Sequence, residues 1–225
     1  MAKRFQNEIE LFKAKDKVKL TFGVLVCTIL SACLLIVAAF TIIPISHYYI
    51  PAKSIFHPII FWSAQHNISE FITHIEYVPQ IPMIAAMTII LGKRFSCIAI
   101  FLYIIAGLFF IPVFSLGGGI KYVFQYSFGY ILGFFPMVII LSSYLQNDFK
   151  PKKVFLASLY SVLALHLCGM IYLTMLCAAK HEPFSYVQDL FHMMTFVKIL
   201  YDFAFTFICV YIANAVRKIL WLSMD

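Results

Sequence analysis

The stretch KLTFGVLVCTILSACLLIVAAFTIIP, residues 19–44, is long and apolar enough to cross a membrane as a helix. A spanning helix needs about 20 mostly apolar residues, because the hydrocarbon core of a bilayer is about 30 Å thick. Further runs of this kind follow along the chain, at 95–114, 128–145, 154–179 and 193–216. The sequence therefore predicts an integral membrane protein built from helices.

A shorter apolar run occupies residues 78–92. Pro79 and Pro82 stand at its beginning, where a missing backbone N–H costs a helix least. Its length is marginal for a full crossing, so a tilted or partly re-entrant helix is an alternative. Counted as a span, it gives an all-α fold with six transmembrane helices.

The bulk composition favours the same class of protein. Hydrophobic residues make up 63% of the chain, charged residues 12%, and the mean hydropathy is +0.92. Soluble domains average about 45–50% apolar and about 25% charged residues, so lipid is the expected solvent. Residues 1–18 are polar, so we expect no signal peptide there.

Lysine and arginine are unevenly distributed between the connections. With the N-terminus inside, thirteen of the seventeen lie at cytoplasmic ends of spans, at positions 3, 4, 13, 15, 17, 19, 93, 94, 150, 152, 153, 217 and 218. Only Lys53, Lys121 and Lys180 fall on the outer side, and Lys198 lies within the last span. The positive-inside rule therefore predicts six spans with both termini in the cytoplasm.

This count defines the expected organisation. We expect a cytoplasmic segment at 1–18, one six-helix substrate-binding domain at 19–219 with a long outer loop at 45–77, and a cytoplasmic tail at 220–225. The net charge of +7 then lies beside membrane ends, where attraction to anionic lipid explains it and a nucleic-acid partner is not required.

Cysteine and histidine spacing predicts no metal site. All six cysteines fall inside apolar runs and are expected to pack as small apolar residues. The four histidines of the outer loop lack tight ligand spacing. Within that loop, residues 58–75 are expected to form an interfacial helix.

The most unusual local sequence is IPVFSLGGGIKYVFQYSFGYILGF, residues 111–134. Its three consecutive glycines predict a turn at the outer face, which either closes a loop or brings backbone close to a ligand. The spacing of a phosphate-binding loop is absent, so we do not expect nucleotide binding.

Together with LGKRF at 91–95, the segments IPVFSLGGG at 111–119 and FGYILGF at 128–134 have the spacing of a known family. Over residues 78–145 the chain resembles the BioY family, the biotin-binding S components of energy-coupling factor (ECF) vitamin transporters. The resemblance implies six helices with both ends inside and capture of biotin from the outer side. It also implies association with a transmembrane coupling subunit and two ATPases.

The last helix departs from the family pattern. Typical members carry PGDxxK there, whose acid and lysine help to hold the vitamin. Residues 199–205 read ILYDFAF, so Asp202 matches the acid while Phe205 stands at the lysine position. The family's PVPITLQ entry to the second helix appears here as PQIPMIA, with Gln80 displaced. These departures leave open a different small vitamin as the ligand.

Lys198 and Asp202 are the ionisable residues of the last span, where each costs about 2.5–3.5 kcal/mol by insertion scales. They are four residues apart and so share a helix face. At about 1.5 Å per residue they lie roughly 7 and 13 Å inside a helix that begins near Met193. Either they form an internal ion pair, or Lys198 snorkels to the interface, or both face an outward-opening cavity. In the last case Lys198 binds the carboxylate of biotin, and Asp202 accepts hydrogen bonds from its ureido N–H groups.

Other candidate ligand contacts come from the re-entry after the glycine turn. Gln125, Tyr126, Ser127 and Tyr130 offer amide, hydroxyl and ring contacts, and the backbone at Gly118 and Gly119 can approach a ligand closely. A lone intramembrane histidine, His166, is expected to be a satisfied packing residue rather than a ligand contact.

The first helix carries small residues at a spacing of four: Gly23, Cys27 and Ser31, with Ala39 continuing the series after Leu35. Such residues let another helix approach closely. The S components that the chain resembles commonly present an AxxxA face of this helix to the coupling subunit. Partner binding and ordinary internal packing are equally consistent with the pattern.

These observations predict a substrate-binding membrane subunit for biotin uptake in the bacterial cytoplasmic (inner) membrane. No cofactor is expected, and because the sequence has no nucleotide-binding motif, any ATP hydrolysis belongs to partner subunits. Function alone or as an oligomer, without ATPase partners, is an alternative. The alternatives are an S component for another vitamin, a membrane enzyme that uses Asp202, His166 or the outer histidines, and a scaffold without a ligand. No spaced nucleophile–base pair supports the enzyme.

Overall fold

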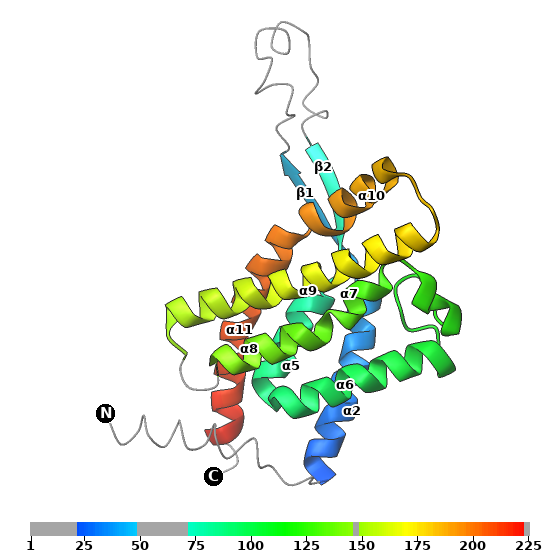
Figure 1. Cartoon of the computed structure of the whole chain (residues 1–225). Coiled ribbons are helices and arrows are strands. Elements are labelled where there is room, and N and C mark those ends of the chain that lie inside the picture. Colours follow the sequence, from blue (N-terminus) through cyan, green and yellow to red (C-terminus); the bar gives the residue numbers. More distant parts are fainter. Residues whose placement is uncertain (1–21, 49–71, 146–148, 223–225) are drawn as a thin grey trace, which may run out of the picture.

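The computed structural model describes residues 22–48, 72–145 and 149–222, so the expected terminal segment 1–18 lies outside the described residues. Helices dominate, and one β-hairpin projects from one end (Figure 1). The elements are α2 (Phe22–Phe40), β1 (Ile43–Tyr48), β2 (Ile72–Tyr77), α5 (Gln80–Leu91), α6 (Lys93–Ile105), the π-helix η2 (Ala106–Phe110), the 3-10 helix η3 (Ile120–Phe124), α7 (Phe128–Leu132), α8 (Phe134–Leu145), α9 (Pro151–Ala179), α10 (Phe184–Phe191), the π-helix η4 (His192–Phe196) and α11 (Ile199–Leu222).

Five helical segments of the described chain are long and apolar enough to cross a membrane: Phe22–Phe40, Lys93–Phe110, Phe128–Leu145, Pro151–Ala179 and Phe184–Ile219. They match the five long apolar runs of the sequence. The short run forms α5, an apolar helix of 12 residues that begins directly after Pro79. The chain is therefore a multi-pass membrane protein, and its sixth crossing stays a prediction.

One apolar core joins the helices. Each of α2, α5, α6, α8, α9 and α11 supplies a side chain that is fully buried: Leu35, Ile84, Ile100, Leu141, Leu165 and Val210. Large apolar side chains such as Phe110 and Leu200 are exposed, at 77% and 73%. In water such exposure is costly, but hydrocarbon solvates these side chains, as expected for helices in a bilayer.

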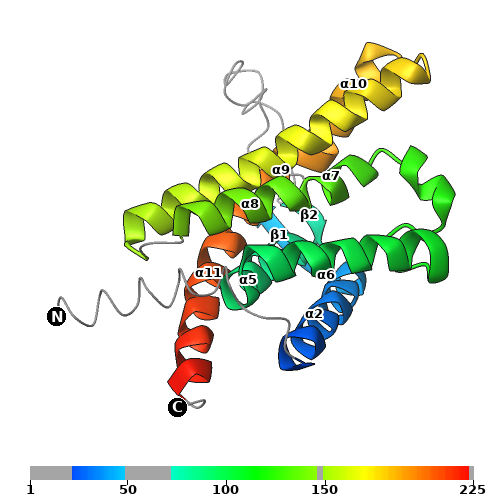
Figure 2. The ribbon, with the colours of Figure 1, turned by 60° about the horizontal axis from the view of Figure 1, so that its bottom comes forward.

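The short helix α5 occupies the centre of the helix packing. It contacts α11 on one side and α2 on the other, and it also touches α6 and α8 (Figure 2). Its own fully buried residues include Ile84 and Ala85. A helix that is covered by protein needs no full bilayer-length apolar run, which explains why 12 residues suffice here.

The base of the outer loop is a β-hairpin rather than a helix. Strands β1 and β2 pair antiparallel, with Ile43 opposite Tyr77 and Ser46 opposite His74. The expected interfacial helix is therefore wrong at residues 72–75, and its remainder at 58–71 lies outside the described residues. In β2, Ile75 and Tyr77 are buried while His74 and Glu76 are exposed, which is the alternation of a half-buried strand.

The last helical segment begins earlier than expected. It starts at Phe184 with α10, passes through the π-helical turn η4 and continues as α11. The expected beginning near Met193 is thus wrong. The polar residues of α10 lower its hydropathy, so the apolar run of the sequence begins later than the helical segment does. Depths for Lys198 and Asp202 counted from Met193 do not apply to this longer segment.

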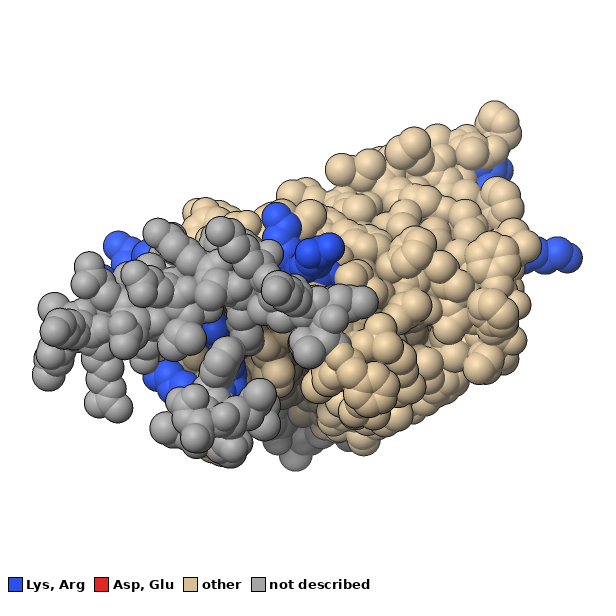
Figure 3. All heavy atoms as spheres, turned by 90° about the horizontal axis from the view of Figure 1, so that it is seen from below, with Lys and Arg blue, Asp and Glu red and all other residues tan. Residues whose placement is uncertain are grey.

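The two ends of the described molecule differ in charge. The start of α2 and the end of α11 lie together at the end opposite the hairpin (Figure 1). Lysine and arginine gather on that face, and no acidic side chain of the described part shows in the same view (Figure 3). This arrangement agrees with the predicted cytoplasmic position of both termini.

Candidate functional site

A buried carboxylate lies at the centre of a three-residue hydrogen-bond network. Asp202 on α11 is 3% exposed and accepts a hydrogen bond from the Tyr77 hydroxyl, with 3.0 Å between the oxygens. Its other oxygen lies 3.1 Å from Nε2 of His166 on α9, whose residue is 2% exposed. The network therefore ties the base of the hairpin to two membrane helices.

The Tyr77 hydroxyl donates one hydrogen bond of this network to Asp202, whereas the roles of His166 Nε2 and the second carboxylate oxygen follow from the tautomer of the ring. Burial, reinforced by the nearby Asp202 carboxylate, raises the pKa of the Tyr77 phenol above its ordinary value, which keeps the donor protonated. Nδ1 of His166 is buried and has no hydrogen-bond partner within the described residues.

This network corrects one expected pairing. The side chains of Lys198 and Asp202 do not form an ion pair in the described structure; Asp202 pairs with His166 instead. His166 was expected to be a satisfied packing residue, and it does bond within the protein, through Nε2. Tyr77 was missed, because it is 125 positions from Asp202 and no sequence period connects a strand end with a distant helix.

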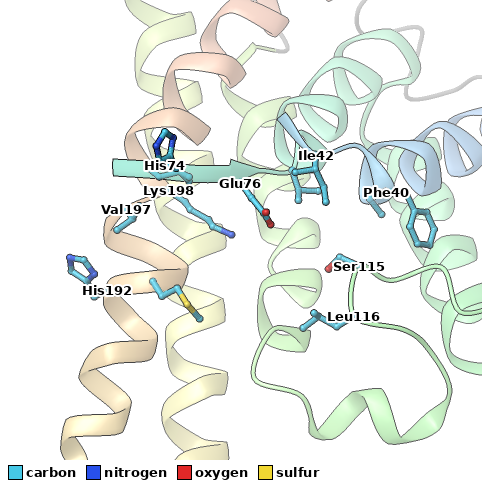
Figure 4. Close-up of a pocket in the computed structure, with 13 residues that line it drawn as sticks. Phe40, Ile42, His74, Glu76, Ser115, Leu116, His192, Val197 and Lys198 are labelled. Atoms are coloured by element: carbon cyan, nitrogen blue, oxygen red, sulfur yellow. The ribbon is translucent and has the colours of Figure 1, made fainter. Parts of the chain in front are cut away.

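A pocket of about 570 Å³ lies beside the network, between the base of the hairpin, the turn after α6 and η4. Its walls are largely apolar, and five polar residues line it: His74, Glu76, Ser115, His192 and Lys198. The side chains of Glu76 and Lys198 point into the space between β2 and the turn at 115–116 (Figure 4). A cavity of this size and composition suits a small organic ligand.

The glycine turn shapes the wall of this pocket. Gly117 and Gly119 have φ angles of +118° and +90°, which L side chains rarely adopt. A Cβ at Gly118 would meet the Cα of Pro112 at 2.6 Å. Neither Gly118 nor Gly119 lines the pocket; their tight turn presents Ser115 and Leu116 to it instead.

The four candidates from the re-entry segment lie away from the pocket lining. Gln125 is exposed, and the Ser127 hydroxyl lies 3.1 Å from the Tyr122 hydroxyl. Tyr126 donates to Glu182 at 3.2 Å, and burial together with this acceptor raises the pKa of Tyr126 to about 12. The hydroxyl groups of Tyr126 and Ser127 therefore form contacts within the protein.

Tyr130 connects the re-entry segment to the buried network. Its hydroxyl lies 2.8 Å from the Thr195 hydroxyl on η4, and its ring stands edge-on to His166 with centroids 5.8 Å apart. Gly169 makes this position possible, because a Cβ there would overlap the Tyr130 ring. Tyr130 thus braces both His166 and the pocket-lining segment η4.

The small residues of α2 divide between two faces. Gly23 and Cys27 are exposed, Ser31 is half-buried, and Leu35 and Ala39 are buried in the core. A spacing of four drifts around a helix with about 3.6 residues per turn, so the series rotates from the surface into the protein. Partner binding by the exposed part stays a prediction.

The fold and site define a multi-pass helical membrane protein with an apolar-walled pocket near the hairpin end. The chain belongs to the BioY family, whose model matches residues 52–221. This confirms the family resemblance of the sequence motifs and extends it beyond residues 78–145.

One named relative and one solved structure are similar to the chain. It is 33% identical over 79 residues to a protein named probable biotin transporter BioY from Lysinibacillus sphaericus, and the match spans 35% of this chain and 40% of that relative. Its fold is similar to the solved S component for biotin of an ECF-type ABC transporter, with a TM-score of 0.61 and 16% identity. That likeness covers 89% of this chain and 95% of the solved one.

Proposed function

We propose that this chain is a biotin-binding S component that captures the vitamin at the outer face of the bacterial cytoplasmic membrane. The observation that carries the proposal is the pocket between hairpin, glycine turn and η4, in a chain of the BioY family. A transmembrane coupling subunit and ATPase subunits supply the energy for reorientation, so this chain itself performs no enzymatic step.

Lys198 is the proposed anchor for the biotin carboxylate. It is half-buried, lines the pocket, and has no ion-pair partner among the described residues. Phe205 occupies the position of the family's lysine, after Asp202 in the sequence. Lys198, which precedes Asp202, therefore supplies the cation instead. The apolar walls suit the thiophane ring and the aliphatic tail of biotin.

The test is equilibrium binding of labelled biotin to the purified chain and its Lys198→Gln variant. A hydrogen bond to a charged group contributes about 1.5–3 kcal/mol, so we expect binding about 10- to 100-fold weaker. Lys121→Gln is the matched control, since Lys121 is exposed and does not line the pocket. Equal affinities for both variants would remove Lys198 from the site.

For Asp202 we propose a positioning role. Its carboxylate is buried and holds Tyr77, the last residue of the strand that brings Ile75 and Glu76 to the pocket. Tyr77→Phe removes this bond and leaves Asp202 in place. We expect Tyr77→Phe and Asp202→Asn to weaken biotin binding alike. If only Asp202→Asn weakens it, Asp202 contacts the ligand directly, as the family pattern implies.

A different small vitamin is the second candidate ligand, favoured by Phe205 at the position of the family's lysine. Competition against labelled biotin decides between the two. Displacement by biotin alone supports the first proposal, whereas tighter binding of another vitamin supports the second.

A further inference from the structure

Two opposite charges share the pocket without pairing with each other. Glu76 comes from β2 and Lys198 from the turn before α11, and both end groups point into the same space (Figure 4). No ion pair joins the two side chains, and neither has a hydrogen-bond partner within the described residues.

A ligand with a lone carboxylate can pair with Lys198 but not with Glu76. It meets Lys198 favourably, but it also faces the negative charge of Glu76. His74 also lines the pocket, and its Nδ1 lies 2.8 Å from the Ser46 hydroxyl. Within the described part of the chain no ion pair involves Glu76, so a ligand that brings its own cation binds with better complementarity.

An α-amino acid group supplies both charges at one carbon atom. Its ammonium group donates to Glu76 while its carboxylate accepts from Lys198, so two side chains from different elements converge on one ligand end. The hydroxyl of Ser115 faces the same space and can donate to the carboxylate.

We propose that the pocket accepts biotin amides that end in a zwitterionic α-amino acid group, of which biotinyl-lysine is the simplest. The inference rests on the proposed function, because the biotin part supplies the apolar contacts. The mouth leaves room for the longer ligand, since Leu116 and Met193 line the pocket and are 67% and 56% exposed.

The experiment measures binding of three ligands to the purified full chain: free biotin, biotinyl-lysine, and the uncharged methyl amide of biotin. Calorimetry or displacement of labelled biotin is suitable. In Glu76→Gln we expect biotinyl-lysine to bind about tenfold more weakly, while free biotin and the methyl amide bind as tightly as before or more tightly. The control Asp189→Asn, on the exposed face of α10, is expected to leave all three unchanged.

The outcomes separate the two proposals. If the unaltered chain binds free biotin but not biotinyl-lysine, the inference is overturned and the proposed function stands. Equal weakening of all three ligands by Glu76→Gln also overturns the inference, since Glu76 would then act only through the shape of the pocket. If none of the three ligands binds to the unaltered chain, the proposed function fails together with the inference.

Discussion

Asp202 is the residue on which the structure and the family pattern differ most. The pattern implies a ligand contact, whereas the described structure surrounds its carboxylate with Tyr77 and His166. A buried charge with partners is tolerable, but the same charge without them is costly. The network therefore links the stability of the helices to the position of the hairpin.

Replacing His166 tests the stabilising role of this network. His166→Ala removes one partner and leaves the Asp202 carboxylate buried with Tyr77 alone, so we expect a loss of about 1.5–3 kcal/mol in the free energy of unfolding. His192→Ala is the control, because His192 is exposed. Denaturant unfolding in detergent measures both, and equal stabilities would contradict the network's role.

At this scale the sequence singled out the charged residues but not their partners. Lys198 and Asp202 were recognisable because ionisable groups are rare in apolar runs. The different surroundings of the two side chains could not be recognised from the sequence. Two residues on one helix face can meet different neighbours, and the spacing does not determine which. The alternation of polar and apolar residues in HIEY, residues 74–77, was an available strand signal that would have placed Tyr77 on the inner face.

Among the elements, α7, α8 and α9 owe their close packing to glycines. At Gly133, next to α8, an added Cβ would meet the backbone oxygen of Leu165 on α9 at 2.7 Å. At Gly23 on α2 an added Cβ meets nothing within 4 Å. The same substitution should thus have opposite consequences at the two positions.

We expect Gly133→Ala to lower the free energy of unfolding by about 1–3 kcal/mol, since backbone cannot move aside cheaply. Gly23→Ala is expected to change it by less than about 1 kcal/mol, in the stabilising direction, because alanine favours a helix. Thermal unfolding of the two variants in one detergent measures the difference. A Gly133→Ala chain as stable as Gly23→Ala would contradict the packing of α8 on α9.

The exposed small residues of α2 give a prediction about partners. Cys27→Phe places a large ring on the face proposed to meet the coupling subunit, so we expect co-purification with that subunit to be lost while biotin binding persists. Leu30→Phe is the control, because Leu30 is already large and exposed on α2. Unchanged co-purification of both variants would assign Gly23 and Cys27 to the lipid-facing surface.

The helices were predictable from the sequence because apolar length is a direct physical requirement of the bilayer. The boundaries missed at α10 and in the hairpin are those where polar residues lie at the membrane end, so that hydropathy carries little information. The role of α5 as a short, central helix also required the structure, because its burial depends on four other helices.

For the whole molecule, the charge distribution makes a prediction about orientation. A periplasmic-type alkaline phosphatase fused after Lys180 should be active, since that connection is expected outside, whereas a fusion after Lys153 should be inactive. A green fluorescent protein at the C-terminus should fluoresce, as it does only when folded in the cytoplasm. The reverse pattern would move the pocket to the inner face and contradict capture from outside.

For the whole molecule, the proposed function requires that the pocket at the hairpin end binds biotin. The most direct test is equilibrium binding of labelled biotin to the purified, unaltered chain. We expect saturable binding of one biotin per chain with a dissociation constant at or below about 1 μM, displaced by unlabelled biotin. No saturable binding at micromolar ligand, with the chain folded, would contradict the account.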